Sequence, residues 1–188
     1  MRKKAATGER SDSELLQMCM RGDEAAFLAL YGRHQGAIFR FALHMSGRRE
    51  TAEEVTQEVF LALLSESRGY LAERGDLQAY LIGVARNKVR RQVRQSRGFA
   101  NFPSEEPAIE AGSFEAMSKR QETRALRKAI LSLPPNYREV VVLCDLENMD
   151  YARAAEQLGC AIGTVRSRLH RARTILGAKL RNGERCPV

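Results

Sequence analysis

The sequence contains no Trp, and none of its apolar runs approaches the roughly 20 residues that cross a bilayer. Its cysteines are few and scattered: Cys19, Cys144, Cys160 and Cys186. They form no CxxC pair, and no His lies at metal-ligand spacing from any of them, so the sequence predicts no metal site. We interpret the first three as small buried residues and place Cys186 in an exposed tail.

Histidine is also scarce, and His34, His44 and His170 have no Ser, Cys or carboxylate pattern beside them. Nucleophilic and acid–base sites require such groups to stand together. We therefore expect no catalytic residue and no cofactor, and a protein that is not an enzyme.

Basic residues outnumber acidic ones by 31 to 23, which gives a net charge of +8 and a pI near 9.7. This excess favours a polyanionic partner, either nucleic acid or an anionic membrane surface. A chain of 188 residues can form one domain or two small ones. Residues 1–12 are basic without an apolar stretch behind them, so we predict no secretory signal, a cytoplasmic location and no membrane insertion.

Residues 150–180 predict two helices joined by a tight turn. Asp150 can cap the first helix, and Gly159 suits the left-handed conformation that ends one. Apolar residues recur in the second helix at a spacing that puts them on one buried stripe. These are Val165, Leu169, Ala172 and Leu176. Two helices joined by a turn containing Gly form the helix-turn-helix arrangement of DNA-binding proteins.

The face opposite this stripe is basic, since residues 163–181 contain six Lys or Arg and no acid. At 100° per residue, five side chains centre on this face: Arg166, Ser167, His170, Arg171 and Thr174. The first four are expected to read base edges. Arg168 and Arg173 flank the face, where we expect them to hold phosphates. The alternative is a solvated basic face on an ordinary helical hairpin, because such faces are common.

A helix expected over residues 52–64 has the opposite charge. Thr51 and Glu54 have the spacing of a capping box, which predicts its start. Its core stripe is Ala52, Val55, Val59, Ala62 and Leu63, and its other face holds Glu53, Glu54, Gln57, Glu58 and Leu61, with Phe60 and Leu64 at the margin. In a basic protein, an acidic face edged by large apolar residues predicts a protein partner with basic residues. A solvated face that balances the helix dipole is the alternative.

A second basic helix is predicted over residues 77–95, after a polar loop at residues 65–75 that ends at the capping residue Asp76. Residues 86–97 hold six bases and no acid. Leu81, Ala85 and Val89 form the buried stripe, and the other side carries Arg86, Asn87, Arg90, Arg91 and Arg94. The chain therefore offers two separate nucleic-acid surfaces.

These elements predict an all-α protein of two small helical domains, at residues 11–97 and 119–182. Ser11 and Glu14 form a capping box at the start of the first. Residues 98–118 contain two Pro and four Glu but no Lys or Arg, and are interpreted as an acidic, flexible linker. The second domain is expected to begin with a helix over 119–133 that turns three side chains to the core, followed by a helix with Pro135 in its first turn. Those three are Leu126, Ile130 and Leu133.

Four ordered motifs in this chain resemble those of the ECF (extracytoplasmic-function, group IV) sigma factors of bacterial RNA polymerase. AEEVTQEVFLALL at residues 52–64 is similar to region 2.2 of that family, and AYLIGVARNKVRRQVR at 79–94 to regions 2.3 and 2.4. LSLPPNYREVVVL at 131–143 and GTVRSRLHRAR at 163–173 resemble regions 4.1 and 4.2. Two positions depart from the family pattern, since Arg153 stands where a Glu is usual and Ala161 where Ser or Pro is usual.

The resemblance implies a promoter-specificity subunit with core RNA polymerase and promoter DNA as partners. In family terms, the first domain would bind core polymerase through Glu54, Gln57, Glu58 and Leu61. Its minus-10 contacts would come from Arg86, Asn87, Arg90, Arg94 and the loop at 65–75. The second domain would read the minus-35 element. The acidic linker would thread toward the active-site and RNA-exit channels, and an anti-sigma protein would hold the factor inactive.

Two other classes of protein account for less of the sequence. A free-standing helix-turn-helix repressor or activator would account for residues 119–182, but it gives the acidic helix and the second basic helix no purpose. A nucleic-acid enzyme would need a metal or acid–base cluster that the sequence lacks.

Overall fold

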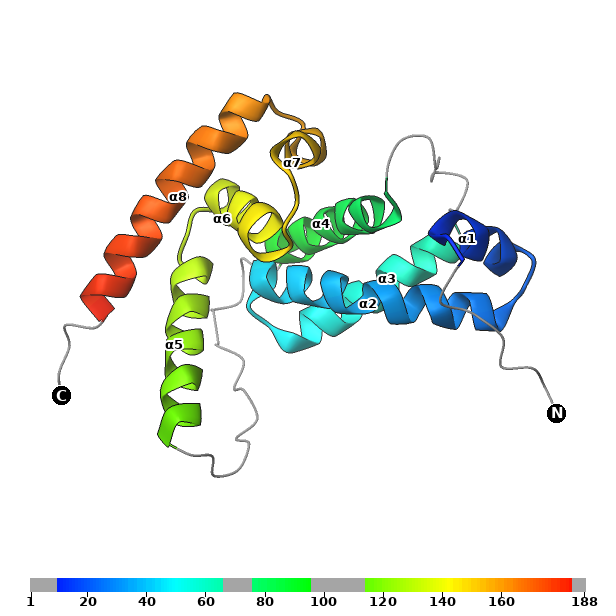
Figure 1. Ribbon diagram of the computed structural model, residues 1–188, viewed down its shortest axis with the longest axis horizontal. Coiled ribbons are helices and arrows are strands. Elements are labelled where there is room, and N and C mark those ends of the chain that lie inside the picture. The colour runs from blue at the N-terminus through cyan, green and yellow to red at the C-terminus, as the bar shows by residue number, and fades with distance from the viewer. Residues whose placement is uncertain (1–9, 66–75, 96–113, 184–188) are drawn as a thin grey trace. The chain divides into compact units, whose positions relative to one another are not determined.

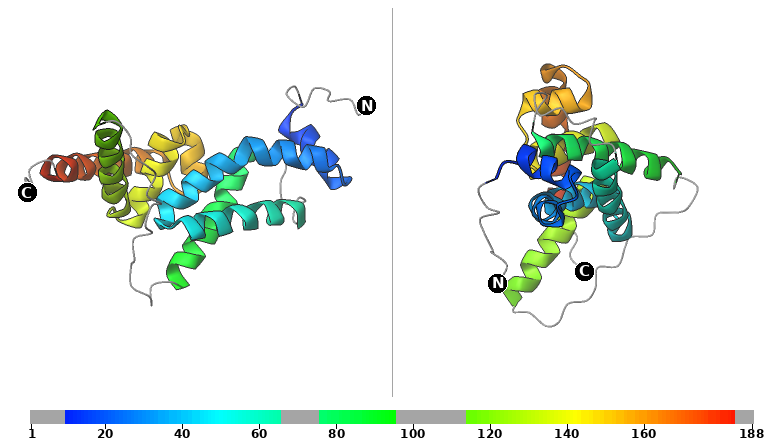
Figure 2. Two further views of the ribbon diagram at one scale, coloured as in Figure 1. Left: turned by 90° about the horizontal axis from the view of Figure 1, so that it is seen from below. Right: turned by 90° about the vertical axis from the view of Figure 1, so that its right-hand side faces the viewer.

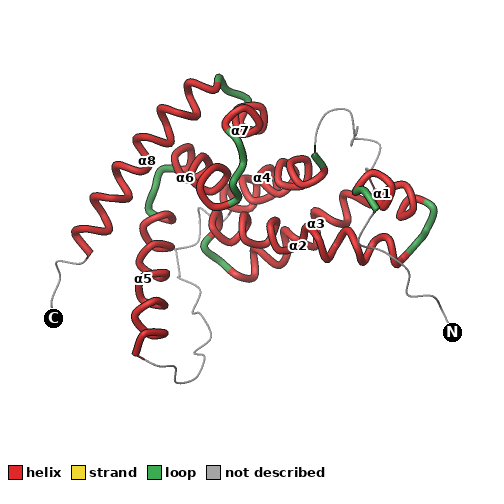
Figure 3. Tube along the Cα trace, in the orientation of Figure 1, coloured by secondary structure: helices red, strands yellow, loops and turns green. Residues whose placement is uncertain are grey.

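The computed structural model describes residues 10–65, 76–95 and 114–183, with side chains over 10–65, 76–92 and 121–181. Every regular element within these ranges is a helix, which confirms the predicted all-α fold class (Figure 3). Contacts between Cα atoms divide the chain into two compact units, one of residues 1–42 and 50–95, the other of 43–49 and 96–188. Nearly all of the predicted loop at 65–75, most of the linker, the Arg94 side chain and Cys186 lie outside the described residues.

The first unit contains α1 (Asp12–Met20), most of α2 (Glu24–Ser46), α3 (Arg49–Ser65) and α4 (Leu77–Gln95), coloured blue to green in Figure 1. The predicted capping box opens α1. The Glu14 amide donates to Ser11 Oγ at 3.3 Å, and the Ser11 amide donates to the Glu14 carboxylate at 2.8 Å. This backbone hydrogen bond lowers the pKa of Glu14.

The second predicted capping box is wrong. α3 begins at Arg49, so Thr51 lies inside the first turn instead of preceding it. The connection from α2 is short: Gly47 adopts a left-handed conformation with φ of 75°, and the Arg48 amide donates to Ser46 Oγ at 3.2 Å. Because this turn reverses the chain within two residues, the helix starts three residues earlier than the predicted Ala52.

Apolar side chains from all four helices form the interior of the first unit. Fully buried examples are Leu15, Leu30, Ile38, Phe41, Val55, Val59, Leu81 and Ile82. Phe27 and Tyr31 of α2 lie against Phe60 of α3, with the Tyr31 and Phe60 ring centroids 4.7 Å apart and those of Phe27 and Phe60 6.2 Å apart. Such aromatic contacts add about 0.5 to 1.5 kcal/mol beyond area burial. Phe60 is therefore a core residue and not the margin residue that the sequence predicted.

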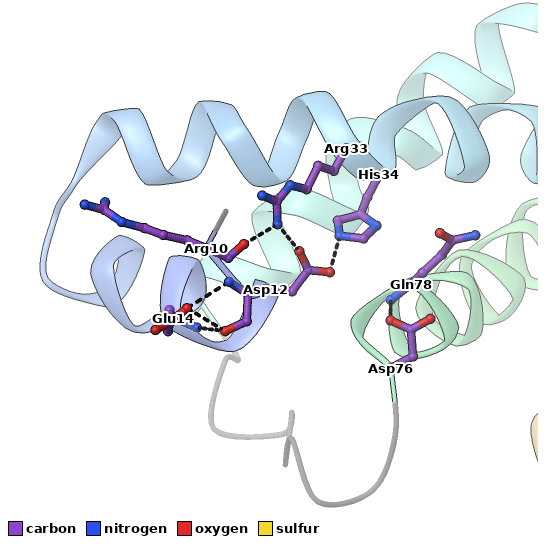
Figure 4. A network of polar contacts seen from close by, with 8 residues as sticks. Arg10, Asp12, Glu14, Arg33, His34, Asp76 and Gln78 are labelled. Carbon is purple, nitrogen blue, oxygen red and sulfur yellow. Dashed lines mark hydrogen bonds and ion pairs between the residues drawn. The ribbon is translucent and has the colours of Figure 1, made fainter. Parts of the chain in front are cut away.

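A polar network fastens α1 to α2 (Figure 4). The Asp12 carboxylate accepts a hydrogen bond from Arg33 Nη1 at 2.8 Å and lies 2.7 Å from His34 Nε2. His34 is buried. The sequence pattern did not predict this carboxylate beside His34, because Asp12 lies 22 residues away in the chain and is brought to it by the packing of α1.

The second unit contains α5 (Phe114–Leu131), α6 (Pro135–Val141), the π-helix η4 (Val142–Leu146), α7 (Tyr151–Leu158) and α8 (Ile162–Gly183). α8 packs against α5, α6 and α7, and Figure 2 shows these helices from two further sides. Pro135 occupies the first turn of α6, as predicted. Arg138 of α6 donates from Nη2 to the Leu131 and Leu133 carbonyls at the end of α5.

Two predictions about α5 are wrong. The helix begins at Phe114, five residues before the predicted Lys119. Ile130 and Leu133 are buried, but Leu126 is 39% exposed and all side chains over 121–126 are exposed. This half of α5 therefore extends past the core, where apolar spacing does not report burial.

The cysteines are less buried than predicted. Cys19 is buried, whereas Cys144 in η4 and Cys160 in the turn before α8 are half-buried. Desolvation, reinforced by the charge of Asp145, raises the pKa of Cys144 to about 11. None of the helices within the described ranges is long and apolar enough to cross a membrane.

Candidate nucleic-acid interface

α7, the turn and α8 have the geometry expected of a helix-turn-helix. Asp150 Oδ1 accepts a hydrogen bond from the Arg153 amide at 2.9 Å and so caps α7. Gly159 adopts the left-handed conformation with φ of 62°, and the Cys160 amide donates to the Ala155 carbonyl at 3.0 Å. Ala161 lies just before α8. It contributes to the start of this helix through its carbonyl, which accepts a hydrogen bond from the Thr164 amide at 2.9 Å.

The apolar stripe of α8 is buried as predicted. Val165 and Ala172 are fully buried, and Leu169 and Leu176 are nearly so. Because these side chains pack into the second unit, they determine which face of α8 is turned inward, and the opposite face must point outward.

That outward face carries Arg166, Ser167, His170 and Arg171, all exposed. In the part of the chain with described side chains, no acidic group pairs with Arg166 or Arg171. Ser167 Oγ donates to the Thr164 carbonyl at 3.0 Å, which holds the hydroxyl along the helix. The face therefore presents two unpaired guanidinium groups, donors suited to the O6 and N7 acceptors of guanine.

The two flanking arginines differ from each other. Arg173 makes a bidentate ion pair with Asp145 of η4, with Nη2 2.6 Å from Oδ1 and Nε 3.1 Å from Oδ2. This hydrogen-bonded carboxylate raises the pKa of Arg173 above its ordinary value. Arg168, on the other flank, is half-buried and has no ion-pair partner among the described side chains.

The basic face of α4 is less open than that of α8. Leu81, Ala85 and Val89 are buried as predicted. On the other side Asn87 and Arg91 are exposed, while Arg86 and Arg90 are half-buried. At the N-terminus of α4, Asp76 Oδ1 accepts from the Gln78 amide at 3.3 Å, which confirms the predicted cap.

Lys88 of α4 forms an ion pair with Glu58 of α3, with Nζ 2.9 Å from Oε2. Both residues were predicted to face outside partners, Glu58 as part of the acidic face and Lys88 as one of the six bases. The pair instead links two helices of the first unit, and both side chains remain partly exposed.

The remaining acidic face of α3 is open. Glu53, Glu54 and Gln57 are exposed, and Leu61 and Leu64 are 65% and 47% exposed. Exposed leucines beside carboxylates form a surface suited to a protein partner. Met20 and Leu28, at 59% and 66% exposed, are further apolar residues on the surface of the first unit.

Besides the Lys88–Glu58 pair, sequence reasoning missed the Asp145–Arg173 pair. Asp145 lies in a π-helix, and no residue pattern used above distinguishes that element from an α-helix. The sole signal was an acid directly before the helix-turn-helix, 28 residues from its partner.

Comparisons with known proteins match both units. Residues 30–99 match the family described as Sigma-70 region 2, and residues 123–176 match Sigma-70, region 4. The two matched segments cover the acidic helix with the second basic helix, and the helix-turn-helix, in that order along the chain.

Individual relatives carry the same kind of description. The ECF RNA polymerase sigma factor SigM of Mycobacterium tuberculosis is 32% identical over 92% of this chain and 86% of its own length. SigE of Mycolicibacterium smegmatis is 32% identical over 81% of this chain, which spans 62% of that longer relative. The sigma factor RpoE of Bartonella quintana, solved with the anti-sigma factor NepR, aligns with a TM-score of 0.66 at 25% identity, over 80% of this chain and 94% of that one.

Proposed function

The chain belongs to the ECF family of RNA polymerase sigma factors, and we propose that it binds core RNA polymerase and directs promoter-specific initiation of transcription. One observation carries this function: an acidic face with exposed leucines and two basic helix faces occur in one chain, in the order of regions 2 and 4. The protein would supply recognition in the cytoplasm, and the polymerase would supply the chemistry.

The minus-35 element would be read by α8. The face of Arg166, Ser167, His170 and Arg171 is exposed while the opposite face is packed, so α8 can enter a major groove without exposing its core. Arg168 would hold a phosphate at the edge of that contact. Arg173 has a different environment, because it is already paired with Asp145.

The minus-10 element would be engaged by α4 and the loop at residues 65–75. Arg86, Asn87, Arg90 and Arg94 would follow the DNA backbone, and the loop would receive an unstacked base. Unstacking costs a few kcal/mol, which a basic surface and a shaped loop can offset.

Core polymerase would bind the face of α3 that holds Glu54, Gln57, Glu58 and Leu61. The exposure of Glu54, Gln57 and Leu61 supports this assignment. Glu58 would contribute less than the others, because Lys88 already neutralises part of its charge.

The domains would divide as 11–97 for polymerase and minus-10 binding, an acidic linker that ends before α5 begins at Phe114, and the residues from there to 182 for minus-35 binding. A linker of this length lets two modules bind separate sites on one duplex. Because RpoE of Bartonella quintana was solved with an anti-sigma factor, we propose that a protein of that class also holds this chain inactive.

The function is tested by mixing purified protein with core polymerase and a library of promoter templates. We expect initiation from a defined set of promoters, and no such initiation by either component alone. A Glu54→Lys, Gln57→Ala double variant should lose binding to core, while Glu122→Lys, an exposed acid on α5, serves as the matched charge reversal. A free-standing repressor or activator would instead bind its DNA equally well without core polymerase.

A further inference from the structure

Arg173 and Arg168 occupy equivalent places on α8 but have different surroundings. At 100° per residue, each lies about 70° from the centre of the buried stripe, on opposite sides. Arg173 meets Asp145 with two short contacts, whereas Arg168 has no acid partner among the described side chains. The two positions are therefore a natural pair for comparison.

Asp145 is held by irregular backbone that is itself well packed. Its π-helix places Val142 and Leu143 in the core, both fully buried. The Met149 amide donates to the Leu143 carbonyl at 2.9 Å, and Asn148 adopts a positive φ of 53°. A π-helix and a left-handed Asn persist only where surrounding structure holds them, and π-helical segments often occur at functional sites. The Asp145 carboxylate is thus presented from a fixed point.

We propose that Asp145 and Arg173 form a positioning pair that fixes the rotation of α8, and so decides which base edges its outward face reaches. This inference rests on the proposed minus-35 function of α8. It also changes the role expected for Arg173, from a phosphate ligand to a positioning residue.

The geometry favours orientation over stabilisation. A bidentate contact between a guanidinium group and a carboxylate fixes both groups in one plane. The Arg173 and Asp145 side chains are 56% and 28% exposed, and ion pairs this accessible contribute little to stability. A buried stripe of four aliphatic side chains holds α8 on the unit and decides which face is inward. The planar ion pair at the edge of that stripe adds a directional contact that restricts the small rotations left to the helix.

The same contact makes Arg173 a poor phosphate ligand. Its charge is matched by Asp145, which accepts from Nε and Nη2, so DNA binding through the remaining N–H groups of Arg173 would gain little from that charge. It would also bring a carboxylate toward the phosphates. Arg168 faces no such competition and remains the phosphate ligand of the pair.

Single variants of the full chain, assembled with core polymerase, test this on a minus-35 library at several salt concentrations. Asp145→Asn and Arg173→Gln should each weaken binding to the preferred minus-35 sequence by roughly three- to tenfold, and each should broaden the range of minus-35 sequences that are bound. The double variant should be no worse than either single one. The dependence of binding on salt should stay unchanged in all three, whereas Arg168→Gln should weaken every sequence alike and lower the salt slope by about one.

If Arg173 is instead a phosphate ligand, the variants should change DNA affinity and its salt dependence in other directions. If Asp145→Asn strengthens binding to all sequences and Arg173→Gln lowers the salt slope by about one, Arg173 is a phosphate ligand with Asp145 as its competitor, and the proposal is overturned. Unchanged affinity and preference in both variants would overturn it too, since the pair would then have no role in recognition.

Conservative variants and melting curves separate positioning from folding. Asp145→Glu retains the charge and should recover most of the preference that Asp145→Asn loses. Melting midpoints of Asp145→Asn and Arg173→Gln should fall by no more than about 4 °C; a much larger fall would make the pair a stability element and sink the positioning role. Wild-type holoenzyme provides the reference. If it initiates at no promoter, the proposed function itself is wrong. If it initiates but the variants do not show the expected changes in minus-35 preference, only the role of the pair is overturned.

Discussion

The two basic helices of this protein, α4 and α8, look alike in sequence but not in structure. Each has a buried apolar stripe and a basic opposite face. On α8 the central side chains, including Arg166 and Arg171, are exposed and have no acid partner among the described residues. On α4, Arg86 and Arg90 are half-buried and Lys88 is paired with Glu58. Equal charge density therefore does not mean equal access for a ligand.

The difference suits two kinds of DNA contact. Reading base edges in a major groove needs side chains that extend freely from a helix whose other face is fixed. Following a single strand needs positive charge close to the protein surface and does not depend on long reach. We therefore infer that α8 recognises sequence directly, whereas α4 acts mainly through charge and through the loop beside it.

The buried faces should behave identically, and this is the largest effect expected. Leu81→Ala in α4 and Leu169→Ala in α8 each remove a nearly fully buried side chain, so each should cost about 2 to 5 kcal/mol of the stability of its unit. Urea unfolding followed by circular dichroism measures the loss, with Leu126→Ala, an exposed leucine, as the control at under about 0.5 kcal/mol. Unequal losses beyond that range would show that one helix is held by something other than its stripe.

The exposed faces should behave differently, with an intermediate effect. Arg171→Ala should cost about 1 to 3 kcal/mol and relax preference at one position of the minus-35 element, because an exposed guanidinium reaches a base edge. Arg90→Ala should weaken binding to all minus-10 sequences by similar factors, because the Arg90 charge acts on the DNA backbone. Binding of both variants to randomised libraries makes the comparison. A position-specific loss for Arg90→Ala would remove the distinction drawn between the helices.

Much of this arrangement could be predicted from local sequence signals. The capping box at Ser11, the cap at Asp150, the left-handed Gly159 and the stripe of α8 each depend on neighbours within a few residues, and each is confirmed. The all-α class followed from the same periodicities. Helix starts were less secure: the spacing of Thr51 and Glu54 suggested a cap, but the length of the preceding turn decided where α3 begins.

Pairings between helices could not be predicted in this way. Lys88 meets Glu58, and Arg173 meets Asp145, across about 30 residues of chain, and only packing brings each pair together. The faces predicted to bind DNA and polymerase are largely exposed, but which cations are already matched inside the protein depends on those pairings. The roles assigned to the individual site residues remain predictions.

The smallest expected effect concerns the Lys88–Glu58 pair, the contact that most distinguishes α4 from α8. Both side chains are partly exposed, at 29% and 40%, so a double-mutant cycle of Lys88→Met and Glu58→Gln in urea unfolding should give a coupling of about 0.2 to 1 kcal/mol. High salt should reduce this coupling.

Glu58→Gln should also release Lys88 toward DNA and raise the salt slope of minus-10 binding by up to about one. The matched Glu24→Gln removes an exposed acid on α2 and should leave that slope unchanged. If both variants leave the slope alone and the coupling is absent, Lys88 is already available to DNA, and α4 and α8 differ only in how far their side chains reach.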